Sequence, residues 1–112
     1  MPFVQIRTNR EVGNESDLLS KLSALAAKEI GKPESYVMAS LAPKMGLSFG
    51  GSQEPAAFIE CKSIGLKSSQ TKGISAALCE FCEQELGVSE DRVYIEFASA
   101  EGSMWGWKGG TF

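Results

Sequence analysis

The sequence predicts an α+β fold in which a four-stranded mixed sheet carries two helices on one of its faces. Two observations support this prediction. The pattern of glycine, acidic and apolar residues in the first half of the 112-residue chain recurs in the second half at an offset of 56 residues. In each half a strand-like segment precedes a helical apolar stripe, and a second strand-like segment follows. We therefore expect one domain, residues 1–112, built from β-α-β units at residues 1–56 and 57–112.

The repeat is clearest where each helix is expected to end. "GKPESYVMASLA" begins at Gly31 and "GVSEDRVYIEFA" begins at Gly87, and the two segments share glycine, acidic and apolar positions. Glycine is favoured there because it readily adopts the left-handed conformation that ends a helix. A right-handed crossover in each unit would join two parallel strands and leave both helices on the same face of the sheet.

The first unit is expected to contain a strand over residues 2–8, a helix that ends at Gly31 and a strand over residues 36–41. Ser16 or Asp17 is expected to cap the helix, because either side chain can accept a hydrogen bond from a free N–H of the first turn. The apolar stripe of this helix consists of Leu18, Leu22, Leu25, Ala26 and Ile30.

The second unit is expected to repeat this order, with a strand over residues 57–66, a helix that ends at Gly87 and a strand over residues 92–97. Ser68 or Ser69 is the expected cap of the second helix. Its apolar stripe consists of Ile74, Ala77, Leu78, Phe81 and Cys82.

The sheet face without helices needs a partner. Strand segments such as "AAFIEC" and "RVYIEF" carry bulky residues at successive positions, which indicates burial on both faces. We therefore expect an oligomer that packs sheet against sheet. The tail "GSMWGWKGGTF" either docks on a partner or folds back on its own subunit, because its aromatic side chains are unfavourable in water.

Composition excludes several classes of function. The net charge is −3 and the 11 basic residues are scattered, so nucleic-acid binding is not expected. No apolar run reaches the roughly 18–20 residues of a membrane span. No signal-peptide pattern opens the chain, so we expect a cytoplasmic protein, with leaderless secretion left open. Histidine is absent, which removes Ser-His-Asp and Cys-His catalysis, and neither a metal nor a cofactor is expected.

The segment from Cys79 to Cys82 has the CxxC spacing of thiol-redox centres. Such centres lie where a helix begins, because the helix dipole there lowers the pKa of the first thiol. Here the motif falls deep inside the second expected helix, which favours two ordinary structural cysteines.

Pro2 and Lys32 are candidate site residues. Removal of Met1 would leave Pro2 with a secondary amine, whose pKa would fall in an apolar pocket beside a cation. Such an amine can take a proton from a carbon next to a carbonyl. On spacing alone, Pro2 is more simply a proline that leads a strand, and Lys32 more simply complements the dipole of the first helix.

Six sequence segments favour the catalytic interpretation of Pro2 and Lys32 over the structural one. "MPFVQIRTN", "GKP", "FGGSQEPAAF", "SIG", "DRVYIEF" and "GWKGGTF" follow one another along the whole chain and together resemble the macrophage migration inhibitory factor family of the tautomerase superfamily. The resemblance implies a homotrimer whose three sheets face a central channel, with active sites between neighbouring subunits. It also implies keto–enol tautomerisation of phenylpyruvate-type 2-keto acids.

Carried over by position, the resemblance implies that trimmed Pro2 is the general base. Lys32 would bind the substrate carboxylate and depress the pKa of Pro2, and the backbone N–H of Ile64 would add a hydrogen bond. Tyr94 of the adjacent subunit would line the pocket and contact the substrate. The remaining pocket residues would be Ser63, beside Ile64, and the apolar walls Phe3 and Trp107.

The chain departs from the family pattern at Glu96, where members often have asparagine. Glu96 shares a strand face with Tyr94, so its carboxylate could repel an acidic substrate or pair with Lys32. Either effect would weaken catalysis. The alternative function is therefore a signalling or binding protein of this family with vestigial tautomerase activity and an unknown receptor.

Two further features of some family members are not expected here. The redox motif of the family would fall at residues 56–59, which hold no cysteine. The charged pair that some animal members present to receptors is also altered, with Glu11 and Lys44 in those regions.

Overall fold

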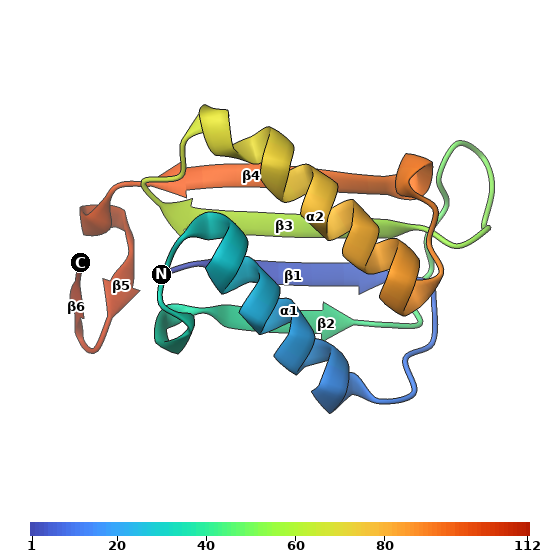
Figure 1. The fold of residues 1–112 in the computed structure, drawn as a ribbon, viewed down its shortest axis with the longest axis horizontal. Coiled ribbons are helices and arrows are strands. Elements are labelled where there is room, and N and C mark those ends of the chain that lie inside the picture. The colour runs from blue at the N-terminus through green and yellow to red at the C-terminus, as the bar shows by residue number, and fades with distance from the viewer.

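Two helices lie side by side on one face of a four-stranded sheet in the computed structural model, which describes residues 1–112 (Figure 1). This arrangement confirms the predicted α+β fold. The strands are β1 (Phe3–Thr8), β2 (Met38–Ala42), β3 (Ala57–Ile64) and β4 (Val93–Ala100), the helices are α1 (Glu15–Ile30) and α2 (Ser68–Leu86), and the C-terminal hairpin is β5 (Gly106–Trp107) with β6 (Gly110–Thr111).

The sheet is mixed, with the strand order β2-β1-β3-β4. β1 runs parallel to β2 and β3 runs parallel to β4, and each parallel pair is connected through one helix. The two units meet along the antiparallel pair β1–β3, where Ile6 lies opposite Ile59. β1 consequently begins at the end of the sheet where the C-terminal hairpin lies, whereas β4 begins at the opposite end (Figure 1).

Helix α1 begins earlier than the sequence suggested. Asn14 is its N-cap, and the Asn14 side chain accepts a hydrogen bond of 3.0 Å from the backbone N–H of Asp17. The predicted cap at Ser16 or Asp17 is therefore wrong, because Asn14 already caps a first turn that contains both of these residues.

Helix α2 also begins one residue early. Ser68 is its first residue and Lys67 precedes it, so a cap at Ser68 or Ser69 is wrong. The side chain of Gln70 closes this end instead, accepting a hydrogen bond of 3.0 Å from the Lys67 backbone N–H. Both helices end as predicted, because Gly31 has a φ of 78° and Gly87 a φ of 66°.

The boundaries of three strands differ from those predicted. Residues Glu34–Tyr36 form a 3-10 turn, so the second strand starts at Met38 rather than at residue 36. β3 ends at Ile64 because Gly65 reverses the chain with a φ of 69°. β4 starts after the 3-10 turn at Glu90–Arg92 and continues three residues beyond the predicted end.

The core lies between the helices and the sheet. Both predicted helix stripes face it, and only Leu25 and Ala77 of these stripes remain half-buried. Val4 and Ile6 of β1 and Ile59 of β3 complete the centre of this layer and are fully buried. Neither helix is long and apolar enough to cross a membrane.

The opposite face of the sheet carries no helix and mixes charged with apolar side chains. Arg7 forms an ion pair of 2.8 Å with Glu60, and Lys62 approaches the same carboxylate at 3.3 Å. The hydrogen bond from Arg7 lowers the pKa of Glu60, and Lys62 lowers it further. On the same face Met38 is 66% exposed and Tyr94 is 65% exposed, and they lie on the two edge strands of the sheet.

Candidate functional site

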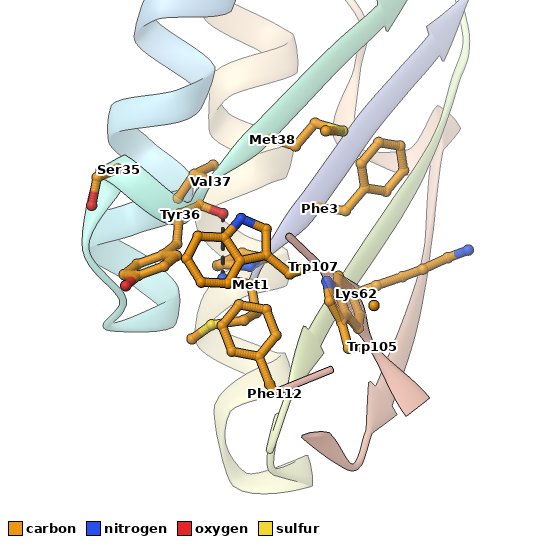
Figure 2. Close-up of a pocket in the computed structure, with 12 residues that line it drawn as sticks. Met1, Phe3, Ser35, Tyr36, Val37, Met38, Lys62, Trp105, Trp107 and Phe112 are labelled. Carbon is orange, nitrogen blue, oxygen red and sulfur yellow. Dashed lines mark hydrogen bonds between the residues drawn. The ribbon is translucent and has the colours of Figure 1, made fainter. Parts of the chain in front are cut away.

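A cavity of about 530 Å³ surrounds Pro2 at the end of the sheet where the chain begins (Figure 2). Three segments form it, because the start of β1, the 3-10 turn before β2 and the C-terminal hairpin meet there. The backbone N–H of Met38 donates a hydrogen bond of 2.9 Å to the carbonyl of Pro2, which ties the start of β2 to the start of β1. Eight of the 12 lining residues are hydrophobic, so the cavity is mainly apolar.

Aromatic side chains form the outer wall of the cavity. The rings of Trp107 and Phe112, from the hairpin, stack with their centroids 5.1 Å apart. Tyr36 meets both rings edge-on, at 5.8 and 6.2 Å. The aromatic tail thus folds back on its own chain, which is one of the two placements that the sequence left open.

Met1 is attached to the nitrogen of Pro2, the candidate base. Pro2 is fully buried, and the Met1 amine donates a hydrogen bond of 3.3 Å to the carbonyl of Tyr36 (Figure 2). Burial lowers the pKa of this amine, and the charge of Lys32 lowers it further. While Met1 is attached, the nitrogen of Pro2 is an amide and has no basic lone pair.

Lys32 lies beside the cavity rather than in its lining. Its backbone N–H donates a hydrogen bond of 3.1 Å to the carbonyl of Ala27, so the end of α1 positions it. The charge of its side chain still lowers the pKa of the Met1 amine. An N-terminal amine, a mainly apolar cavity and a nearby cation therefore occur together within one chain.

Phe3 and Trp107 line the cavity with Pro2, whereas Ser63 and Ile64 do not. Ser63 is buried on the helix side of β3, and its hydroxyl donates to the carbonyl of Ile64 at 3.4 Å. Ile64 follows at the end of the same strand, on the face without helices.

Sequence reasoning missed part of the lining, including Lys62, Tyr36 and Phe112. Lys62 lies opposite Phe3 in the β1–β3 register, and its stem borders the cavity while its amine points away (Figure 2). That register depends on tertiary pairing, so no local signal could reveal it. The aromatic residues of the C-terminal tail did predict that the tail would pack against the protein. They did not predict on which subunit.

Tyr94 and Glu96 lie away from this cavity. Tyr94 borders a second, mainly apolar cavity of about 420 Å³ at the other end of the sheet, where its ring lies 4.7 Å from that of Phe49. Glu96 is exposed and lies beside Glu60 in the β3–β4 register. A single chain therefore does not bring Tyr94 to Pro2, because β1 and β4 begin at opposite ends of the sheet.

The cysteines lack the environment of a redox pair. Cys79 and Cys82 lie inside α2, and Cys82 is fully buried. Burial raises the pKa of Cys82 to about 12 and that of Cys61 to about 11, and it also raises the pKa of Cys79. The reactive thiolate is therefore disfavoured at all three positions.

The fold and the cavity define a class of small two-layer proteins that are built from two β-α-β units and have a mainly apolar cavity at the start of β1. The chain belongs to the macrophage migration inhibitory factor (MIF) family, since the family model "Macrophage migration inhibitory factor (MIF)" matches residues 1–112. This family lies within the tautomerase superfamily, which supports isomerase activity in general.

Individual relatives agree with this assignment. The chain is 40% identical to a MIF homolog from Trichinella spiralis, and the match covers 100% of both chains. It is 38% identical to MIF from Xenopus tropicalis, over 100% of this chain and 99% of that protein. Among solved structures, the MIF homologue from Prochlorococcus marinus superimposes with a TM-score of 0.92 at 39% identity and 98% coverage of both chains.

Proposed function

We propose that this protein is a keto–enol tautomerase for phenylpyruvate-type 2-keto acids, with Pro2 as the general base once Met1 is removed. One observation carries the proposal. The amine at the start of the chain lies in a mainly apolar cavity, where burial and the charge of Lys32 both lower its pKa. Lowering the pKa increases the unprotonated fraction of an amine at neutral pH, and the unprotonated form can act as a base.

Removal of Met1 opens the site and creates the base in one step. The Pro2 nitrogen becomes a secondary amine at the base of the cavity, and its direction is set by the pyrrolidine ring and β1. This nitrogen accepts the proton from the carbon next to the substrate carbonyl as that C–H bond breaks. It then donates the proton to the enolate oxygen, so the amine is regenerated and no cofactor is consumed.

The surroundings suit an aromatic 2-keto acid. Lys32 attracts the carboxylate, while Trp107, Phe112 and Tyr36 provide an apolar surface for the ring. We further propose that the active protein is a homotrimer, in which Tyr94 of an adjacent copy completes each site. The exposed Met38 and Tyr94 on the sheet face without helices support this assembly.

The test is ketonisation of phenylpyruvate, followed by ultraviolet absorbance, with protein whose intact mass shows that Met1 is absent. Pro2→Gly should abolish the rate, and Pro43→Gly, at the far end of β2, should retain it. Light scattering should give three times the 12.0 kDa chain mass. A rate that persists unchanged in Pro2→Gly would refute the role of Pro2.

The second candidate is a MIF-like signalling or binding protein with weak activity. The Glu96 carboxylate favours it, because Glu96 is exposed beside Glu60 and would face an acidic substrate together with Tyr94. The receptor is unknown, and Glu11 and Lys44 form an exposed ion pair of 3.4 Å that offsets their charges. A trimer without activity that retains a partner after Pro2→Gly would support this candidate.

A further inference from the structure

Arg92 lies at the end of the 3-10 turn that leads into β4, two residues before Tyr94. Its guanidinium group faces the loop that connects the two β-α-β units. All three of its nitrogens donate to backbone carbonyls of that loop, which are those of Pro55 at 2.9 Å, Phe49 at 3.2 Å, and Ser52 and Glu54 at 3.1 Å each.

This loop has few other connections to the domain. Gly50 and Gly51 have φ values of 60° and 80° and allow the chain to double back, so that Phe49 and Ser52 pair with each other. Asn9 holds the later part of the loop, through the carbonyls of residues 53 and 54 and the N–H of Ala56. Arg92 is consequently the side chain that ties the tip of the loop to β4.

The tip of the loop in turn contacts Tyr94. The Arg92 guanidinium lies 5.2 Å above the Phe49 ring, and the same ring contacts that of Tyr94, at 4.7 Å and 53°. Tyr94 is 65% exposed, so few other contacts restrict its position. Phe49 and Tyr94 together form one wall of the second cavity.

We propose that Arg92 is a positioning residue for Tyr94. It holds the loop, the loop presents Phe49, and Phe49 fixes the tyrosine ring where a neighbouring copy meets this end of the sheet. The inference rests on the proposed function, in which Tyr94 contacts the substrate of the adjacent subunit. Arginine is required because lysine, as a single point charge, cannot engage four carbonyls in a planar fork.

The experiment compares Arg92→Lys with Arg10→Lys in protein labelled with 3-fluorotyrosine. The chain has only two tyrosines, so fluorine NMR gives two resonances, and Tyr36→Phe assigns them. Arg10 is the matched control because its Nε donates to a single backbone carbonyl, that of Leu86, at 2.9 Å and away from the loop. We expect Arg92→Lys to shift and broaden the Tyr94 resonance and Arg10→Lys to leave it unchanged.

Kinetics supply the second readout. Arg92→Lys should raise the KM for phenylpyruvate about three- to tenfold, the equivalent of one lost hydrogen bond, with kcat changed less than about twofold. Phe49→Leu should have a similar effect on KM, and the two substitutions should not be additive, because they interrupt the same chain of contacts.

The outcomes separate this inference from the proposed function. An unmoved Tyr94 resonance in Arg92→Lys, or an equal shift in Arg10→Lys, would overturn the positioning role even if stability fell. A shifted Tyr94 resonance with an unchanged KM would show that Arg92 positions Tyr94 without affecting substrate binding, and would overturn that part of the inference. If the proposed tautomerase function is wrong, the parent protein will be inactive. The fluorine resonance will still report whether Arg92 positions Tyr94.

Discussion

Pro2 is chemically inert or basic depending on a single peptide bond. With Met1 attached, Pro2 is buried and its nitrogen is an amide. Without Met1, the same nitrogen would be an amine beside the position where burial and Lys32 lower the pKa of the Met1 amine. Lys32 contributes to that effect without lining the cavity, so its charge matters more than its contact.

The role of Lys32 predicts a pH dependence. The rate requires unprotonated Pro2, so activity is lost as the pH falls through the pKa of Pro2. Lys32→Ala removes a charge that lowers this pKa, and the acidic limb of the kcat/KM profile should move to higher pH. Lys28→Ala is the control, because Lys28 is exposed in the last turn of the same helix. Equal profiles for both variants would contradict the proposed role.

At the scale of the elements, glycine has opposite effects inside α2 and just beyond its C-terminal end. Gly87 ends the helix with a φ of 66°, a conformation that costs energy for any residue with a side chain. Gly73 lies inside the helix, where glycine only adds conformational freedom to the unfolded chain. An added Cβ at Gly73 would meet no atom within 4 Å.

The same substitution should therefore change stability in opposite directions. Gly87→Ala should lower the free energy of unfolding by about 1 kcal/mol, and Gly73→Ala should raise it by about 0.5–1 kcal/mol. Denaturant titration at one fixed protein concentration measures both, since oligomerisation makes stability depend on concentration. A stabilising Gly87→Ala would contradict the left-handed helix end.

At the scale of the whole molecule, the two ends of the sheet hold different parts of the proposed site. The Pro2 cavity lies where β1 begins, and Tyr94 lies at the opposite end, where β4 begins (Figure 1). The central antiparallel pair keeps these ends apart in every copy. Only a neighbouring copy can supply Tyr94 to Pro2, which is why the assembly and the activity are proposed together.

A complementation experiment tests this shared site. Pro2→Gly should be inactive, and Tyr94→Ala should be reduced about tenfold in kcat/KM. When equal amounts are unfolded and refolded together, about a quarter of the sites should combine an intact Pro2 with an intact Tyr94. The mixture should then be more active than the mean of the two variants. Activity at or below that mean would show that each site lies within one chain.

Local patterns in the sequence were sufficient for the helices and their ends. The two apolar stripes recur every three to four residues, and Gly31 and Gly87 follow them directly. The helix caps are not where the sequence predicts them, because several polar residues near each helix start can accept from its free N–H groups, and Asn14 and Gln70 are the ones that form hydrogen bonds there. The predicted starts of β2 and β4 were wrong because 3-10 turns at residues 34–36 and 90–92 precede them. Such short turns carry no distinct hydrophobic period in the sequence.

The sequence by itself determined the two β-α-β units, the family and the identity of Pro2 and Lys32 as candidates, because these depend on order along the chain. The tertiary structure alone decided that Lys62 borders the cavity, that the aromatic tail covers its own subunit, and that Tyr94 lies far from Pro2. These features depend on strand register and on contacts between distant segments. Such contacts form only when the whole sheet is assembled, so no local pattern encodes them.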